Sequence, residues 1–412
     1  MCNTFYYLKG GSERCFLDLS ALLVANGHEV IPFCMDNERN FDSPYADYFV
    51  SYIDFPSQLN GRAGLKGKLR VGERVIYSRE ARRNIEKLIA DTQPDIAHIH
   101  GIAHEISPSI LPAIKKAGIP IVQTLHDFKL LCPNTNFLSQ EHVCEQCKGH
   151  RYYNVVKNRC KRGSLSASIL AGVEMYTHKI SQIYERNTDV FIAPSKFLQR
   201  KVKEFGIKNE VINIPNFINP NSFTPCFEPE NYFFFFGRLT KIKGVTTLLE
   251  AMRQIKTSHL YVAGSGELHD PLLAYANEHT IKNITFLGFQ TTEKLIPRIQ
   301  KAAFSIISSE CYENYPMSVL ESLACGTPVI GASIGGIPEL VKDGETGLLF
   351  EAGNADDLAQ KIQYLLDNRQ LAIEMGRNGR KLVEANNNPE THYQATMDIY
   401  QRLSKNRLPY LK

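Results

Sequence analysis

The sequence predicts an α/β protein made of two doubly wound domains, each built on a parallel sheet. The main observation is that short apolar, strand-like runs alternate with helix-like segments in both halves of the chain, a pattern typical of parallel sheets covered by helices. A length of 412 residues is sufficient for two domains with separate cores. Hydrophobic residues at 43% and charged residues at 22% are typical of a globular protein.

Composition narrows the function classes. The chain has no run of eighteen apolar residues and no basic-then-apolar leader after Met1, so we expect a cytoplasmic protein. In that compartment the ten cysteines would be thiols or metal ligands rather than disulfides. A net charge of +4 by itself argues neither for nor against a nucleic-acid partner, and we expect none.

The N-terminal domain is predicted over residues 1–218. Gly10-Gly11 opens a helix that ends near Asn26, and a strand is expected from Glu29 to Phe33. The other expected strands of this domain are 95–99, 119–124, 189–193 and 211–214, with helices over 76–90, 108–117 and 195–205. Because a glycine pair before a helix lets the backbone approach a phosphate, Gly11 is a candidate phosphate contact.

The second domain is predicted over residues 219–389, after a hinge rich in proline and asparagine at 216–229. Its expected strands are 232–236, 259–263, 283–287, 303–308 and 328–331, each followed by a helical segment. Two such domains place a ligand cleft between the carboxyl ends of their strands.

The segment 303–331 reads as strand, loop, helix and strand, with Pro316 expected at the first helical position. Glu313 lies in the loop and Glu321 in the second turn of the helix. The backbone N–H groups of Asn314, Tyr315 and Met317 lie between them, where unpaired donors favour anionic or hydroxyl-rich ligands. This arrangement suits a sugar joined to a phosphate, although a lone pair of glutamates is more often two solvated residues around a helix start.

Basic residues follow the aromatic strand 232–236. Arg238 could grip a phosphate through two N–H groups, and Lys243 would add a point charge beside it. A solvated basic turn is the alternative. Gly264 and Gly266 form a glycine-rich turn after the next strand, which is weak evidence when taken alone.

These motifs resemble those of the retaining glycosyltransferases of family 4, which have the GT-B fold of two Rossmann-like domains facing across a cleft. The first motif is a Glu-x7-Glu pattern followed by a strand and a glycine turn. It comprises Glu313, Glu321, Gly326-Thr327-Pro328-Val329, Gly335-Gly336 and Glu339. The second is a GRLxxxKG motif, formed by Gly237-Arg238-Leu239 and Lys243-Gly244. The resemblance implies that Glu313, with the 314–317 backbone, contacts the donor sugar and that Glu321 binds the ribose. It also implies that Arg238 and Lys243 bind the diphosphate and that Gly264 and Gly266 lie near the nucleotide.

The same resemblance assigns His126 to the donor sugar as a second catalytic residue; a histidine bonded at a strand end is the alternative. It implies transfer with retention through front-face attack. It further implies that the C-terminal helix, 390–412, packs back on the N-terminal domain. The chain contains no Asp-x-Asp triplet, so we expect no cofactor to be required for catalysis.

The start of the chain departs from the family pattern. In that family a buried first strand precedes the glycine loop, whereas here residues 3–7 look like the loop itself. We therefore expect the chain to be truncated, or its start assigned too late. We further expect the N-terminal sheet to lack a central strand and to be poorly stable.

Four cysteines mark an insert at 132–162: Cys132, Cys144, Cys147 and Cys160. Their spacing fits a structural zinc, free thiols or, less well, disulfides. A catalytic zinc is not expected, because no water-activating arrangement accompanies them.

Two basic stretches lie in the acceptor-side domain and fit either a solvated helix face or contact with anionic membrane lipids. Their residues are Arg62, Lys66, Lys68, Arg70, Arg74, Arg79, Arg82, Arg83 and Lys87.

The sequence thus favours a metal-independent glycosyltransferase that moves a sugar from a nucleotide-diphosphate sugar to a glycan or polyprenyl-linked acceptor in cell-surface glycan synthesis. It would be cytoplasmic, with peripheral association at the inner face of the membrane. The alternatives are a nucleotide-sugar epimerase of the same architecture and a catalytically inactive glycan- or nucleotide-binding subunit.

Overall fold

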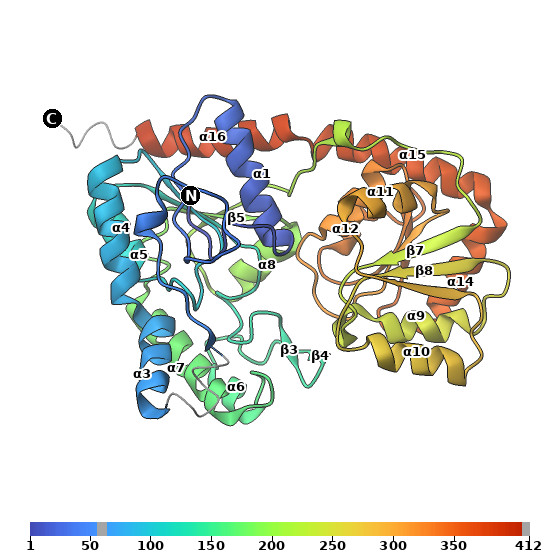
Figure 1. Ribbon diagram of the computed structural model, residues 1–412, viewed down its shortest axis with the longest axis horizontal. Coiled ribbons are helices and arrows are strands. Elements are labelled where there is room, and N and C mark those ends of the chain that lie inside the picture. Colours follow the sequence, from blue (N-terminus) through green and yellow to red (C-terminus); the bar gives the residue numbers. More distant parts are fainter. Residues whose placement is uncertain (56–63, 406–412) are drawn as a thin grey trace.

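The computed structural model describes residues 1–55 and 64–405 as two α/β bodies side by side (Figure 1). Each is built on a parallel sheet, as the sequence predicts. The first sheet has the order β1-β2-β5-β6, with strands Ala97–Ile99, Ile121–Thr124, Val190–Ala193 and Glu210–Asn213. The second has the order β12-β11-β10-β7-β8-β9, with strands Gly347–Phe350, Val329–Ala332, Ser305–Ile307, Tyr232–Phe236, His259–Ala263 and Ile284–Gly288.

Helices cover both sheets. In the N-terminal part they are α1 (Gly11–Ala25), η1 (Ala46–Tyr48), α3 (Gly64–Tyr77), α4 (Arg79–Thr92), α5 (Ile110–Lys116), α6 (Tyr153–Lys157), α7 (Leu165–Ser181) and α8 (Lys196–Glu204). In the C-terminal part they are η2 (Pro220–Ser222), η3 (Lys241–Lys243), α9 (Val245–Met252), α10 (His269–Glu278), α11 (Thr292–Lys301), α12 (Met317–Ala324), α13 (Ile337–Leu340), α14 (Ala355–Asp367) and α15 (Arg369–Asn386). Six strands are buried on both faces, which is why their sequences are mainly apolar: β1, β2, β5, β7, β10 and β11.

The last helix, α16 (Pro389–Lys405), lies over the N-terminal body beside α1 (Figure 1). Its Ile399 and Tyr400 share a buried cluster with Leu19 and Leu23 of α1. The chain therefore crosses between the bodies twice, near residue 216 and near residue 387. At this double crossing the Asn387 side chain donates to the Asn216 carbonyl at 2.8 Å, and the Ile218 N–H donates to the Asn387 carbonyl at 2.9 Å.

The start of the chain corrects part of the prediction. Residues 3–7 belong to no strand, as expected, and Glu29 to Phe33 is no strand either. Cys2, however, bridges Phe33 on one side and Ile99 on the other in parallel register, so the central place in the sheet is occupied by a single bridge rather than vacant.

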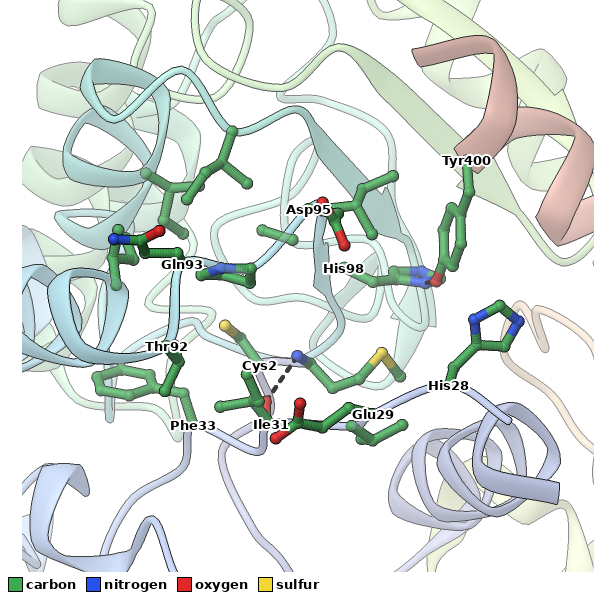
Figure 2. A pocket seen from close by; sticks show the side chains of 18 of the residues that line it. Cys2, His28, Glu29, Ile31, Phe33, Thr92, Gln93, Asp95, His98 and Tyr400 are labelled. Carbon is green, nitrogen blue, oxygen red and sulfur yellow. Dashed lines mark hydrogen bonds between the residues drawn. The ribbon is translucent and has the colours of Figure 1, made fainter. Parts of the chain in front are cut away.

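A cavity of about 420 Å³ adjoins this bridge, between the segments 28–33 and 92–98 (Figure 2). The Met1 ammonium group donates to the Ile31 carbonyl at 2.9 Å beside it. His28 and Tyr400 lie toward one end of the cavity and Gln93 toward the other, as Figure 2 shows.

Candidate active site

The candidate site is a cleft of about 690 Å³ between the two bodies. Both sheets present the carboxyl ends of their strands to it, as expected for doubly wound domains. The cleft brings together nearly all the residues singled out from sequence: Gly11, His126, Arg238, Lys243, Glu313, Asn314, Tyr315, Met317 and Glu321. These residues come from α1, the loop after β2, the loop after β7 and the segment that leads into α12.

Two helices begin at this cleft without a side-chain cap. Gly10 is the N-cap of α1 and Pro316 is the N-cap of α12, so the helix begins one residue later than predicted. The two helix starts are close, because a Cβ on Gly11 would lie 3.8 Å from the Met317 side chain. Uncapped first-turn N–H groups on two helices make this end of the cleft attractive to anions.

Arg238 and Lys243 lie in the cleft, on the loop after β7. The glycine-rich turn after β8 packs against this loop. A Cβ on Gly264 would lie 1.8 Å from the Gly237 carbonyl oxygen, and one on Gly266 would lie 2.3 Å from the Leu239 carbonyl oxygen. Gly264 and Gly266 are not among the residues that line the cleft. Both positions require glycine because the two loops pack backbone against backbone.

Lys243 forms an ion pair with Glu313, which also accepts a hydrogen bond from the Ser309 hydroxyl at 2.6 Å. Burial by itself would raise the pKa of Glu313, but Lys243, Ser309 and Arg238 outweigh it and lower that pKa. The pKa of Lys243 is raised: burial opposes this, but the neighbouring Glu313 dominates. Both groups therefore stay charged near neutral pH.

The loop that holds Glu313 is fixed by the glycine pair after β11. A Cβ on Gly336 would lie 1.8 Å from the Asn314 carbonyl oxygen, and the Gly336 N–H donates to the Glu313 carbonyl at 2.7 Å. Only a glycine lets the two segments approach this closely.

Glu321 is paired with Arg14 of α1, a residue that the sequence did not single out. Burial raises the pKa of Glu321, and the positive charge of Arg14 opposes that increase. Arg14 follows Gly11 by one helical turn. Its role could not be read from sequence, because the pairing joins two elements 307 residues apart.

His126 lies in the cleft wall, and its Nε2 lies 2.8 Å from Nδ1 of His100. Burial lowers the pKa of His126 to about 4, so the ring is neutral near pH 7. His100 stacks in turn on His98, whose Nδ1 lies 2.5 Å from the Tyr400 hydroxyl of α16. Nε2 of His100 is buried without a hydrogen-bond partner.

The side chains of Asn314 and Tyr315 are already engaged. Asn314 accepts from the Ser195 hydroxyl at 2.7 Å and donates to the Leu125 carbonyl at 2.9 Å, so it joins the two bodies. The Tyr315 hydroxyl accepts from Asn387. Both residues would therefore meet a ligand through their backbones.

Glu339, part of the same motif, contacts the N-terminal body. Its carboxylate accepts from the backbone N–H groups of Lys196 and Phe197 at 2.8 and 2.6 Å. It therefore caps α8 from across the cleft.

The four cysteines lie outside the cleft, where they line one small cavity within the insert. In residues 1–55 and 64–405, no group of three or more His, Cys, Asp or Glu side chains already stands in an arrangement that could hold a metal ion. Over the same residues no helix is long and apolar enough to cross a membrane.

The basic stretches are only partly as predicted. Arg62 lies outside the described residues. Arg74 is buried rather than exposed; it pairs with Glu80 and donates to two backbone carbonyls, so it is a structural residue. Arg82 pairs with Glu86. Lys66, Lys68 and Arg70 are exposed on α3.

Comparison with known proteins agrees with this geometry. The family model described as Glycosyltransferase Family 4 matches residues 9–222, and that described as Glycosyl transferases group 1 matches residues 222–382. The chain is 30% identical over 197 residues to an uncharacterised glycosyltransferase of Methanocaldococcus jannaschii, a match covering 47% of this chain and 54% of that relative. It is 24% identical to the glycogen synthase of Mycobacterium tuberculosis, over 98% of this chain and 95% of that one.

Two solved structures share the fold. The sucrose-phosphate synthase of Thermosynechococcus elongatus superposes with a TM-score of 0.69 at 20% identity, covering 97% of this chain and 95% of its own. Anabaena HepE in complex with UDP gives 0.67 at 17% identity, covering 97% and 98%. Matches to the two family models together run from residue 9 to residue 382, and the chain belongs to glycosyltransferase family 4, with the GT-B fold.

Proposed function

We propose that this glycosyltransferase moves a sugar from a nucleotide-diphosphate sugar to a glycan or polyprenyl-linked acceptor, with retention and without a metal ion. The observation that carries the proposal is the convergence of Arg238, Lys243 and two uncapped helix starts on one side of a cleft that also holds Glu313 and Glu321. Cations and N–H groups suit a diphosphate, and carboxylates suit hydroxyl groups.

In this proposal the nucleotide displaces the two ion pairs of the cleft. Lys243 moves from Glu313 to the diphosphate, which frees Glu313 to accept hydrogen bonds from the donor sugar. Arg14 releases Glu321, which then accepts from the ribose hydroxyls. HepE, which shares the fold, is known in complex with UDP and in complex with UDP-glucose, so uridine nucleotides are the first donors to test.

The reaction would be a front-face displacement. The bond between the sugar C1 and the β-phosphate oxygen breaks as the acceptor oxygen bonds to C1 on the same face. The acceptor hydroxyl proton passes to the departing phosphate oxygen. Arg238 and Lys243 offset the negative charge that develops there, which is the usual largest source of rate in such sites. Neutral His126 orients the sugar without taking a proton.

A separate surface supports peripheral membrane association. The outer face of α7 exposes five large apolar side chains at helical spacing: Leu165, Ile169, Val173, Tyr176 and Ile180, from 36% to 80% exposed. Helix α3 packs beside α7 (Figure 1) and exposes Leu69 together with Lys66, Lys68 and Arg70. An apolar stripe flanked by cations suits the interface of an anionic bilayer, where a lipid-linked acceptor would be found.

The donor site is tested by thermal shift with UDP-, GDP-, ADP- and dTDP-sugars, each with and without EDTA. We expect one nucleotide to raise the melting temperature regardless of EDTA. The shift should be lost in Arg238→Ala and kept in Arg253→Ala, which removes an exposed arginine at the end of α9. Binding without sugar transfer to any acceptor extract would instead indicate an inactive subunit, and no shift with any nucleotide would refute the donor site.

The proposed membrane-binding face of α7 and α3 is tested by flotation with two kinds of vesicle. One kind contains anionic phosphatidylglycerol and the other contains phosphatidylcholine alone. We expect binding to the anionic vesicles and its loss in Ile169→Gln/Ile180→Gln. A control, Leu273→Gln, changes an exposed leucine of α10 and should leave flotation unchanged. A dimer that dissociates in the double variant would assign the α7 face to self-association instead.

A further inference from the structure

The insert of residues 132–162 brings four cysteine side chains to one small cavity. Cys132, Cys144, Cys147 and Cys160 line a space of about 10 Å³, together with Pro133, Asn134 and Leu138. That space is close to the volume of a single water-sized sphere. All ten cysteines of the chain are free thiols, and no other part of the fold collects more than two of them at one cavity described here.

Backbone N–H groups are directed at these sulfur atoms. Burial raises the pKa of Cys132, while backbone hydrogen bonds from Asn134, Phe137 and Thr135 oppose that increase. The sulfur of Cys147 receives a similar backbone hydrogen bond from Val155. Backbone N–H groups therefore contact two of the four sulfur atoms.

The insert contains little regular structure of its own. Its regular structure is the two-residue strands β3 (Leu138–Ser139) and β4 (His142–Val143) and the five-residue helix α6. Cys147 and Tyr152 form a small buried cluster with Met175 of α7, and Cys132 and Phe137 join the main core of the N-terminal body. Of the twelve non-glycine residues with positive φ in the described parts of the chain, seven lie here: Thr135, Phe137, Gln140, Glu141, His150, Arg159 and Arg162. Such a segment needs a cross-link to compensate for the cost of its backbone conformation.

We propose that these four cysteines bind one structural zinc ion. Four thiolates around a single-atom space match the tetrahedral sulfur coordination that zinc prefers, and cysteines spaced as Cys144-x-x-Cys147 supply two of its ligands. The thiols do not yet stand as a ligand set, so binding requires side-chain rotation toward the shared cavity and the release of the thiol protons.

The zinc would stabilise one wall of the active site without contacting substrate. The β3–β4 turn extends toward the C-terminal body (Figure 1), where Glu141 pairs with Lys241. Glu145, between Cys144 and Cys147, accepts a hydrogen bond from the Tyr312 hydroxyl at 2.7 Å and pairs with Lys201. Tyr312 immediately precedes Glu313. The proposed ion therefore fixes the segment that contacts the Glu313 loop from across the cleft.

The direct test is the metal content of the full chain, purified with reductant and without a metal-affinity tag. We expect about one zinc per chain by mass spectrometry of the elements. The ion should be lost in Cys144→Ser and in Cys160→Ser. It should be retained in Cys226→Ser, which changes a partly exposed cysteine of the C-terminal body outside the cluster.

A second measurement uses the unmutated chain, so that it does not depend on the variants folding. Zinc is displaced with a mercurial, the thiols are regenerated with reductant, and Co²⁺ is titrated in. We expect the near-ultraviolet charge-transfer band and visible absorption of tetrahedral cobalt bound to thiolates. Absence of both zinc and the cobalt bands would overturn the proposal. So would an intact mass lower by two hydrogens for each disulfide, which would assign the cluster to cross-links.

Discussion

At the scale of single residues, the cleft contains cations and carboxylates that neutralise one another until a ligand arrives. Lys243 with Glu313 and Arg14 with Glu321 form two such pairs at the two ends of the α12 motif. A partly buried pair of this kind is weak evidence for stability, because the desolvation of its charges offsets their attraction. In each pair the cation lowers the pKa of its carboxylate and holds it in position, although the pKa of Glu321 stays raised by burial.

Arg14 provides the first prediction. Replacing it by glutamine removes the positive charge that lowers the pKa of Glu321, so the rise in pKa caused by burial should become larger. A protonated Glu321 accepts ribose hydrogen bonds poorly. The affinity for the donor nucleotide should therefore begin to fall at a higher pH in Arg14→Gln than in the unmodified chain.

This is measured by calorimetry of nucleotide binding between pH 5 and 7.5. Each unit of pKa shift corresponds to about 1.4 kcal/mol, or about tenfold in affinity where the group is protonated. Lys9→Gln is the control, because Lys9 lines the same cleft and contacts the Phe5 ring rather than Glu321. Identical pH profiles in the two variants would contradict the role given to Arg14.

The site residues predicted from sequence were those whose motif is local. Arg238, Lys243, Glu313 and Glu321 each lie within a short local motif, so the resemblance to the family could be recognised in the sequence and predicted their place in the cleft. Arg14 and His100 were missed because each acts on a partner from a different element. A buried histidine pair and an interdomain ion pair leave no periodic pattern in a single sequence.

At the scale of elements, the strands of the C-terminal sheet were the best predicted. β7 and β8 have the expected boundaries, since β7 is buried on both faces, β8 is buried on one, and each apolar run coincides with its strand. α7 was not predicted, although Leu165 to Ile180 shows helical spacing. Its apolar residues on the outer face are exposed, so they do not mark a core. Arg74 is the opposite case: it is charged, so the sequence suggested an exposed residue, but it is buried.

The double crossing between the bodies provides the second prediction, for Asn387→Ala. The change removes donors to the Asn216 carbonyl and the Tyr315 hydroxyl and leaves both acceptors buried. An unsatisfied buried polar group costs about 1–3 kcal/mol. We expect the melting temperature to fall by about 2–4 °C per kcal/mol, as is typical of larger domains.

Asn386→Ala is the matched control, because Asn386 is the exposed last residue of α15 and should change the melting temperature little. Donor binding by Asn387→Ala at a temperature well below its melting point should also weaken, because Tyr315 belongs to the cleft. Equal melting of the two variants would show that the crossing is held by other contacts.

At the scale of the whole molecule, the N-terminal body buries a line of histidines that runs from α16 to the cleft. His98, His100 and His126 stack successively, and His392 lies near them at the crossing. Burial is the main cause that lowers the pKa of each, to about 4 for His126 and His392. The fold therefore holds four imidazoles in their neutral form.

These groups predict that stability falls as the pH is lowered. The unfolded chain takes up protons on these histidines near pH 6.5, whereas the native His126 and His392 resist protonation until about pH 4. Between those values unfolding takes up protons, so the free energy of unfolding should decrease by about 1.4 kcal/mol per pH unit for each histidine. Glu105, whose pKa burial raises to about 7, acts in the opposite sense and offsets the contribution of one histidine.

The contribution of one histidine to the pH dependence of stability can be isolated with His392→Gln. Glutamine can still donate a hydrogen bond to the Pro215 carbonyl, which His392 contacts at 2.9 Å. Melting temperatures are compared at pH 7.5, 6.5, 5.5 and 5.0. We expect the variant to lose less stability than the unmodified chain over this range, while His142→Gln, in the exposed β3–β4 turn, follows the unmodified chain. If His392→Gln and the unmodified chain fall in parallel, the neutral histidines do not set the acid limit. That limit would then lie with carboxylates whose pKa the fold lowers, such as Glu313, because their stabilising charge is lost as the pH falls.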